Sequence, residues 1–473
     1  MKRILKYGFL AWLLVSIVGA PFYWPYLRML WVFNPMVAGP SYDSPVNEAD
    51  ARRQDLDYLS TLLKYDRSFS SEAEAEFAAS LEAISADVET LNAAEFYLAL
   101  AEAVALGDNG HTNISYHPQY TEFNTIGARL YWFEEGLYIV GAEPEKAHLV
   151  GRRVVGIEGR DPGEVQQTLR KYRGGNDTWR DLTTLLLLES PELLFAAGIV
   201  GSPQSVTLEL EAGDGTREAV VFDGTLPENG DDLPYRRAWQ ALAPAHTIPG
   251  DEDWQHVLEP AVGERLRYLN DTGSALSHPL EGGGYYIRSF PGFAVGDTPI
   301  KRAYKTALAE TGDVPLDYLI VDFRINDGGD YTKSMDFAKI ASGTLKPDGT
   351  LYIITGPNTF SAAIVTVAML KYYSDGRAII IGEPMGDREQ FWAERGTSFQ
   401  LPNSGYYINY ATGFHDWEDG CKGERHCYTM NEMHGVAAGS LAPEIMVPMD
   451  FARYANGEDV VLDFIRARQL AED

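Results

Sequence analysis

The sequence predicts an α/β layer fold in its C-terminal part, preceded by a small β-rich module and a helical N-terminal region. From residue 285 onwards, short apolar runs alternate with helix-like stretches, as in repeated strand–loop–helix units. Between about residues 126 and 210, paired short apolar runs are instead typical of antiparallel strands. Helix-capping sequences come before both regions. A chain of 473 residues is expected to form two to three domains.

The N-terminus has the pattern of an export signal. Three basic residues within the first six precede an uncharged stretch from Tyr7 to Tyr26, and roughly 20 such residues suffice to span a bilayer. Residues 1–32 are therefore expected to be an uncleaved signal anchor, with the rest of the chain exported to the periplasmic or extracytoplasmic side. A cleaved signal is the alternative, although Pro21 directly follows the small residues where cleavage would occur.

Residues 33–117 are expected to be a linker followed by helices. One helix is predicted to open at Ser71 and another at Asn92, because a glutamate follows each by three residues, as in a capping box. The apolar side of the second helix is expected to carry Phe96, Leu100 and Val104. A tight polar loop that contains His111 follows that helix directly.

Residues 118–225 are expected to form the β-rich module. The segment Arg129–Val140 predicts a hairpin, and further strands are expected at 151–159 and 206–210 with a helix between them. This order resembles a PDZ domain, in which a chain end adds to an exposed strand edge. A β-sandwich insert without a ligand is the alternative. Residues 226–284, rich in Pro, Gly and acidic residues, are expected to be a connecting segment.

Residues 285–473 are expected to form the α/β layer. Tyr318–Phe323 is a continuous apolar run of the kind that a buried parallel strand requires. Further strands are predicted at 351–355 and 378–381, and helices at 331–341 and 362–373.

Ser361 is the strongest candidate for a catalytic residue. It follows a predicted buried strand and opens a predicted helix, whose N-terminus offers the unpaired N–H groups that a developing oxyanion needs. The alternative is that Ser361 or Thr359 only caps the helix. Gly328 and Gly329 are predicted at the end of the neighbouring strand, where their backbone and the N–H of Ala362 would form an oxyanion hole.

A serine nucleophile needs a base and a carboxylate that orients it. His111 is the expected base, because it lies in a glycine-rich loop at a helix end rather than within an apolar run. His415 is its rival. The expected acid is Glu418, with Asp416 as the alternative, since both lie in the loop that holds His415.

Several sequence blocks, in order along the chain, resemble those of the C-terminal processing peptidases and the related tricorn core proteases. The resemblance covers about residues 91–462. It implies a crotonase-like (ClpP/crotonase-type) catalytic domain preceded by a PDZ-like domain, and hydrolysis of peptide bonds by a serine-type endopeptidase through an acyl-enzyme on Ser361. The matching blocks are Gly107–Thr112, Val321–Gly329, Asn358–Ala363, Ile381–Gly386, Leu401–Gly405 and Pro443–Val447.

The chain departs from the processing-peptidase branch in one respect. That branch uses a lysine as the base, shortly after the block that follows the nucleophile, whereas this chain has Gly386-Asp387-Arg388-Glu389 there. An arginine does not give up its proton in the working range. The resemblance therefore favours the branch that uses histidine, with His111 as the base.

The two cysteines, Cys421 and Cys427, are expected to form a local disulfide in an exported chain. The alternative is a zinc site with neighbouring histidines, namely His415, His426 and His434.

A formal charge of −29 disfavours nucleic acid as the main partner. The glycine-rich turns lack the lysine of a phosphate-binding loop, so no cofactor or metal is expected. The expected partner is a polypeptide substrate, and the sequence does not indicate an oligomeric state. Three alternatives to a peptidase remain: a non-catalytic peptide-binding relative, an esterase or amidase on small substrates, and a structural envelope protein.

Overall fold

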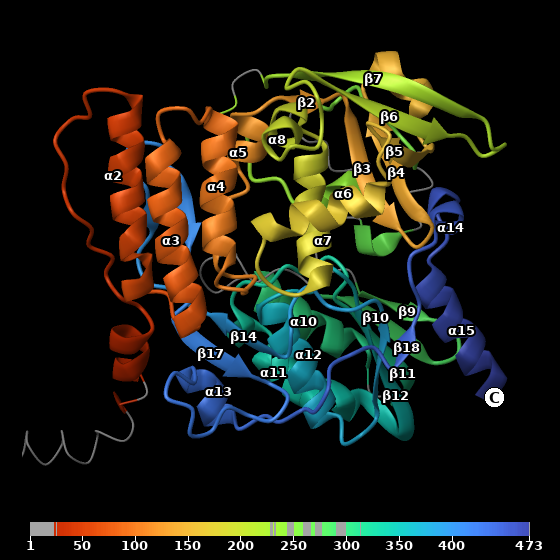
Figure 1. The fold of residues 1–473 in the computed structure, drawn as a ribbon. Coiled ribbons are helices and arrows are strands. Elements are labelled where there is room, and N and C mark those ends of the chain that lie inside the picture. The colour runs from red at the N-terminus through yellow and green to blue at the C-terminus, as the bar shows by residue number, and fades with distance from the viewer. Residues whose placement is uncertain are drawn as a thin grey trace, which may run out of the picture.

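The structure is a computed structural model that describes residues 23–24, 26–227, 230, 233–243, 250–258, 266–269, 277–289, 299–312 and 314–472. Three parts are visible in Figure 1: helices near the N-terminus, a β-rich module, and an α/β layer that includes the C-terminal helix. The expected signal anchor lies mostly outside the described residues and stays a prediction. Among the described residues, no helix has the length and apolar character needed to cross a membrane.

The N-terminal helices form as the capping sequences predict, with one shift. The capping box of Asn92 with Glu95 is present at the start of α4. At α3 the capping side chain is that of Ser70, which accepts a hydrogen bond from the Ala73 N–H, so the cap lies one residue earlier than the expected Ser71. The predicted apolar side of α4 is buried. The helices are α2 (Glu48–Ser60), α3 (Ser71–Asp87), α4 (Ala93–Ala105) and α5 (Pro118–Thr121).

The β-rich module contains the expected hairpin, β3 (Ala128–Phe133) with β4 (Gly136–Ala142). Its sheet has the order β2-β7-β6-β5-β4-β3, and β8 pairs with β4. Two helices in it, α7 and α8, were not expected. The other bounds are β2 (Thr125–Ile126), β5 (Arg153–Ile157), α6 (Pro162–Leu169), α7 (Asp177–Leu188), α8 (Pro191–Ala196), β6 (Ser205–Glu211), β7 (Arg217–Thr225) and β8 (Gln255–His256).

The α/β layer has a six-stranded sheet of order β18-β13-β12-β11-β10-β9, in which only β9 runs antiparallel to its neighbour. The expected continuous strand, β11, is buried on both faces because α12 and its neighbours cover one face and α15 covers the other. The bounds are β9 (Ser277–Leu280), β10 (Gly284–Arg288), α10 (Pro299–Glu310), β11 (Leu316–Asp322), α11 (Met335–Ile340), β12 (Leu345–Thr355), α12 (Ala362–Tyr373), β13 (Ala378–Gly382), β18 (Ile445–Met446), α14 (Phe451–Ala455) and α15 (Val460–Glu472).

Two small sheets connect the α/β layer to the N-terminal helices. β14 pairs with β17, and β16 pairs with both β15 and β1, the strand that follows the His111 loop. The polypeptide that follows the predicted base is therefore tied to the C-terminal half of the chain. The bounds are β1 (Asn113–Ile114), β14 (Gln390–Ala393), β15 (Phe399–Gln400), β16 (Tyr407–Asn409), β17 (Gly413–Asp416) and α13 (Thr429–His434).

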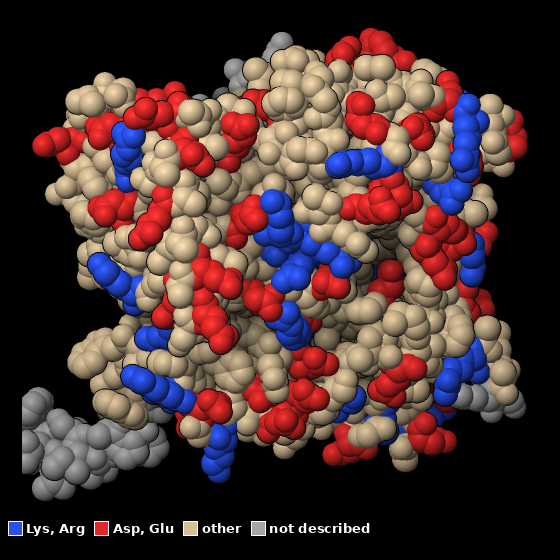
Figure 2. All heavy atoms as spheres, viewed as in Figure 1, with Lys and Arg blue, Asp and Glu red and all other residues tan. Residues whose placement is uncertain are grey.

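The charge of the chain is visible on the surface. On the face in Figure 2, acidic side chains are spread over most of the outline, and Lys and Arg gather in a smaller group near the centre.

Candidate functional site

Ser361 has a strained backbone at the point where α12 begins. Its φ of 55° and ψ of −121° lie where residues other than glycine are rarely found. Its side chain does not cap the helix, and the Thr359 hydroxyl bonds to the Gly356 N–H and the Phe323 carbonyl instead. The capping interpretation of Ser361 is therefore wrong, and such strain is typically kept where it serves a function.

Gly328 lies directly against Ser361. A Cβ on Gly328 would come within 2.7 Å of the Ser361 Cβ and 3.2 Å of the Ala362 nitrogen, and the φ of Gly328 is +109°. Its N–H donates to the Asn326 side chain over 3.0 Å. No hydrogen bond from the N–H of Gly329 or of Ala362 is found among the described residues. Of the three expected oxyanion residues, Gly329 and Ala362 thus have a backbone N–H that could donate to an oxyanion. Gly328 instead leaves room beside Ser361, because it has no side chain.

A small hollow opens beside these donors. It reaches from Gly328 and Ala362 to Ile300 and Tyr331, and a water-sized group can occupy about 10 Å³ of it. At one wall the hydroxyls of Ser334 and Thr366 lie 2.7 Å apart and bond to each other. The hollow lies beside the two N–H groups and has room for about one water-sized group.

The loop that carries His111 is held by a buried carboxylate. The Thr112 hydroxyl donates to Asp66 over 2.6 Å, and the N–H of Ala411 donates to the same carboxylate oxygen over 2.8 Å. Burial raises the pKa of Asp66, and its hydrogen bonds from Ser68 and Thr112 oppose that shift. Asp66 therefore joins the His111 loop to the chain after β16.

The His111 ring lies between two phenyl rings. Its centroid is 4.4 Å from that of Phe360, the residue before Ser361, and 5.4 Å from that of Phe391 on β14. Its side chain is only 17% exposed. These contacts bring the predicted base next to the segment that ends in the predicted nucleophile. No hydrogen bond joins His111 to Ser361, and both ring nitrogens are buried without one.

The carboxylate beside His111 belongs to Asp387. Its Oδ2 lies 3.5 Å from His111 Nδ1, and its side chain is 1% exposed. The other oxygen, Oδ1, accepts the backbone N–H of Arg388 over 2.9 Å. Because Oδ2 has no other hydrogen-bond partner, it is available to accept a hydrogen bond from the Nδ1–H of the imidazole.

The Arg388 side chain connects the two loops that carry His111 and Asp387. Its guanidinium donates to the carbonyl and to the carboxylate of Asp108, each over 3.0 Å. Arg180 on α7 forms an ion pair with the other oxygen of Asp108. Asp108 itself has a φ of 43°, a conformation that these two arginines hold in place. Arg388 therefore positions the loop and does not act as a base.

The expected acids do not meet the imidazole. Asp416 caps a turn, where its Oδ1 accepts the N–H groups of Glu418 and Asp419. Partial burial, then the charge of Glu389 and its acidic neighbours, raises the pKa of Glu418. Neither carboxylate lies within 4 Å of His111, whereas Asp387 does. Both were expected because they follow His415 in the chain, but the His111 loop folds against the end of β13 instead.

His415, the rival base, is engaged elsewhere. It stacks on Phe391, on which His111 also stacks, and its Nε2 lies 3.4 Å from the Glu394 carboxylate. Its Nδ1 accepts the indole N–H of Trp417 over 3.3 Å. With a side chain 1% exposed, His415 is part of the wall behind His111.

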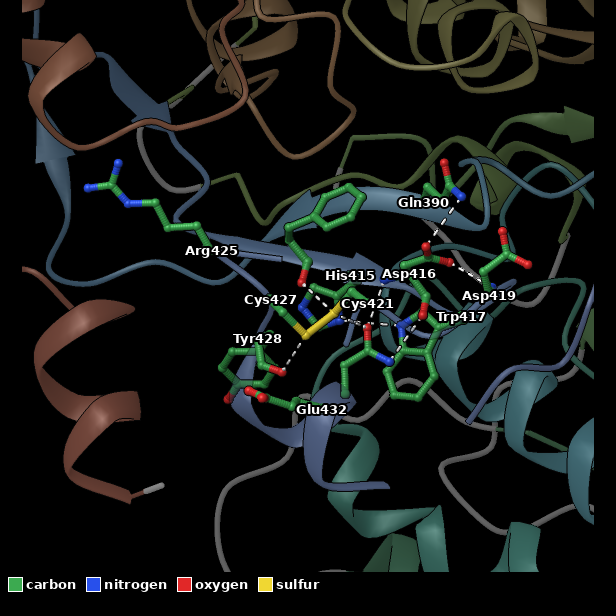
Figure 3. Close-up of a disulfide and its surroundings, with 12 residues drawn as sticks. Gln390, His415, Asp416, Trp417, Asp419, Cys421, Arg425, Cys427, Tyr428 and Glu432 are labelled. Carbon is green, nitrogen blue, oxygen red and sulfur yellow. Dashed lines mark hydrogen bonds between the residues drawn. A yellow bond between two sulfur atoms is a disulfide. The ribbon is translucent and has the colours of Figure 1, made fainter. Parts of the chain in front are cut away.

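The Cys421–Cys427 disulfide favoured by the sequence is present and closes the loop after β17 (Figure 3). Beside it, the side chain of Asn431 bonds to the backbone N–H and carbonyl of Asp416. Since β17 pairs with β14, which carries Phe391, the disulfide steadies one side of the His111 pocket. Within the described part of the chain, no three His, Cys, Asp or Glu side chains gather as metal ligands would, the three histidines of the zinc alternative included.

Sequence reasoning missed Asp387, although a signal was present. This residue lies five positions after the end of β13, the strand that pairs with β12 before Ser361, and the ends of parallel strands meet at one edge of a sheet. The segment Gly386–Glu389 lacks a lysine, and its carboxylate at Asp387 is the signal for a partner of His111.

Comparisons with known proteins agree with this architecture. No protein family and no curated protein sequence matches the chain. Among solved structures, mature CPAF complexed with lactacystin superposes with a TM-score of 0.54 and 12% identity, over 89% of this chain and 98% of that chain. Mature CPAF gives a TM-score of 0.53 and 13% identity, over 89% and 96%. At these identities the likeness establishes a shared mixed α/β fold.

A C-terminal processing protease is also among the structural neighbours. The photosystem II D1 C-terminal processing protease aligns with 13% identity over 87% of this chain and 98% of that chain, with a TM-score of 0.34.

Proposed function

We propose that this protein is a serine peptidase that hydrolyses peptide bonds through an acyl-enzyme on Ser361, with His111 as general base and Asp387 as the orienting acid. The observation that carries the proposal is the buried His111–Asp387 pair, whose facing atoms have no other hydrogen-bond partner, beside a serine with a strained backbone. A buried histidine and carboxylate next to a serine are the parts of an activated nucleophile.

In the proposed reaction, Ser361 Oγ attacks the substrate carbonyl and its proton passes to His111 Nε2. Asp387 accepts the Nδ1–H, which fixes the tautomer and stabilises the imidazolium. The oxyanion receives the N–H groups of Ala362 and Gly329. His111 then protonates the leaving amine, and water repeats the sequence to release the acid. For the first step, Oγ and Nε2 must approach to about 2.6–3.2 Å, and this approach often tightens only when substrate binds.

We further propose the domain division that the sequence resemblance implies. Residues 285–473 would be a crotonase-like catalytic domain and residues 118–225 a PDZ-like domain, with a connecting segment at 226–284. The helical region at 33–117 supplies the base and residues 1–32 the membrane anchor of an exported enzyme. The parallel sheet with helices on both faces supports the first assignment, and the antiparallel sheet with α6 beside it supports the second.

Hydrolysis of an unfolded protein tests the proposal. The full chain is expected to degrade fluorescently quenched casein, and the Ser361→Ala variant is expected to lose turnover while keeping its circular dichroism spectrum. Ser60→Ala, which changes an exposed serine at the end of α2, is the matched control and should retain full activity. Equal turnover by the Ser361→Ala protein would exclude this serine as the nucleophile.

A further inference from the structure

A larger cavity lies where the β-rich module meets the α/β layer. It is partly open to solvent, and a water-sized group can occupy about 30 Å³ of it, which is room for one or two groups of the size of a water molecule or an ammonium head. Its floor is formed by the segments that follow β11, β12, β13 and β18, the sheet edge at which α/β proteins commonly bind ligands. Tyr131 of β3 lines the opposite side. We call this space the junction cavity, and Ser361 is not among the residues that line it.

The walls combine apolar side chains with three tyrosines. Tyr131, Tyr268 and Tyr454 are each at most 5% exposed. The hydroxyls of the last two contact Met449 and the Leu242 carbonyl. The Tyr131 hydroxyl interacts with the side-chain amide of Asn358, which is 5% exposed and also lines the cavity.

The charged groups that line the cavity include more carboxylates than cations. Four carboxylates and one guanidinium line it. The guanidinium, Arg324, is fully used: it bonds to Asp322 and, through both terminal nitrogens over 3.0 and 2.7 Å, to Asp459. The other three carboxylates are those of Glu383, Asp450 and Glu458.

Two of these carboxyls, Glu383 and Asp450, lack an ion pair within the described residues. Glu458 pairs with the Arg453 guanidinium over 2.8 Å, whereas Asp450 caps α14 by accepting the backbone N–H of Arg453 over 2.7 Å. No described Lys, Arg or His lies within 4 Å of the Glu383 carboxyl, which interacts with the backbone N–H of Met449. A ligand that enters the cavity thus meets carboxyls without a paired cation among aromatic rings.

This chemistry selects a class of ligand. An anion would find the only guanidinium occupied and four carboxylates around it. A fully apolar ligand would bury Glu383 without compensation. A protonated amine would pair with Glu383, and tyrosine rings add attraction for a cation. The hydrocarbon stem behind the charge would lie in the open part of the cavity, against apolar side chains of its lining.

We propose that the junction cavity binds a primary ammonium group carried on a short apolar stem. A lysine side chain of a polypeptide and a free alkylamine share this chemistry. The inference goes beyond the proposed function and does not require it, because the cavity and its carboxyl are distinct from Ser361, His111 and Asp387.

Calorimetric titration of the full-length Ser361→Ala protein with n-butylammonium tests the proposal, since no turnover is needed. Butylammonium is expected to bind at least about tenfold more tightly than 1-butanol, which has the same stem without the charge. Glu383→Gln is expected to weaken butylammonium binding by about tenfold or more. Asp348→Asn, an exposed carboxylate near the opposite end of β12, should leave it unchanged.

Equal binding of the amine and the alcohol, or an unchanged affinity in a folded Glu383→Gln protein, would overturn the proposal. If that variant does not fold, the pH dependence of binding to the Ser361→Ala chain decides instead, and an affinity independent of pH between 6 and 7.5 would contradict it. A parallel titration with N-acetyl-lysine amide distinguishes the sources. Tighter binding than butylammonium supports a polypeptide lysine, and weaker binding supports a free amine.

Discussion

Oδ2 of Asp387 lies 3.5 Å from Nδ1 of His111, and neither atom has another hydrogen-bond partner. The two residues are far apart in the chain, and they meet because the His111 loop is fastened on both sides. Asp66 holds Thr112 from one side, and Arg388 holds Asp108 from the other. The site is therefore assembled from the N-terminal helical region and the ends of the parallel strands.

Replacing Asp387 by asparagine should impair the base without disturbing the packing. An asparagine can donate to Nδ1 and favour the wrong tautomer, so kcat is expected to fall by about 10³- to 10⁴-fold with little change in KM. Steady-state kinetics on a quenched peptide measure both. Glu418→Gln is the matched control, expected to stay within about threefold of the parent. The reverse ranking of the two variants would restore Glu418 as the acid.

A methyl group at Gly328 should disable the site sterically. Its Cβ would come within 2.7 Å of Ser361 Cβ and 3.0 Å of the Phe360 carbonyl, at a φ of +109° that alanine rarely adopts. Gly328→Ala is expected to lose at least about 100-fold in kcat/KM, as expected for a misplaced nucleophile. Gly343→Ala, where nothing lies within 4 Å of the added Cβ, should retain activity. Comparable rates for the two variants would show that this close approach is not needed.

Arg388 is expected to position the His111 loop and not to act as a base. Its removal frees Asp108 and the His111 loop, and kcat is expected to fall by about 10- to 100-fold. The pH profile of the residual activity should keep the shape of the parent's profile. Arg395→Ala, which removes an exposed arginine that bonds to Asn409, is the control. If Arg388→Ala were as inactive as His111→Ala while remaining folded, its role would have to be chemical.

Amine binding in the junction cavity should depend on pH through Glu383. Burial raises the pKa of Glu383 to about 7, against the opposing effects of Met449 and Arg324. Only the ionised carboxylate pairs with an ammonium group, so affinity is expected to fall by about eightfold from pH 7.5 to pH 6 and to level off at higher pH. Calorimetry at these pH values measures the change, which the Glu383→Gln variant should lack.

The groups that face Glu383 do not reverse the expected fall in amine affinity at lower pH. Arg324 is held by two carboxylates and stays charged. Glu134 is an acid whose charge raises the pKa of Glu383 further. The remaining carboxylates and tyrosines of the cavity are those of Asp450, Glu458, Asp459, Tyr131, Tyr268 and Tyr454. Burial raises the pKa of all three tyrosines, which therefore remain neutral.

The local patterns predicted the catalytic layer well, because β11 and α12 are specified by contiguous residues. The apolar run Tyr318–Phe323 falls within β11 except for Phe323, and the predicted helix 362–373 matches α12. The sequence pattern did not predict α7, whose residues from Leu182 to Leu188 are all buried. In that second half every side chain is buried, so the local pattern does not single out one apolar face.

The site residues likewise differ in whether a local sequence pattern predicts them. Ser361 and His111 each carry a local signal, a strand end or a glycine-rich loop. Their carboxylate partner is set by how the His111 loop packs against the end of β13, and no local pattern encodes that long-range contact. The sequence offers Glu418 and Asp416 because they lie in the loop of His415, and that histidine faces Glu394 on the other side of Phe391.

Labelling with a fluorophosphonate tests the central claim most directly. The full chain, its His111→Ala variant and its Asp387→Asn variant would be treated alike, and the modified residue mapped by mass spectrometry. The account predicts an adduct on Ser361 that disappears in the first variant and forms far more slowly in the second. Absence of an adduct in the folded parent protein, or equal labelling of Ser361 in the His111→Ala variant, would contradict it.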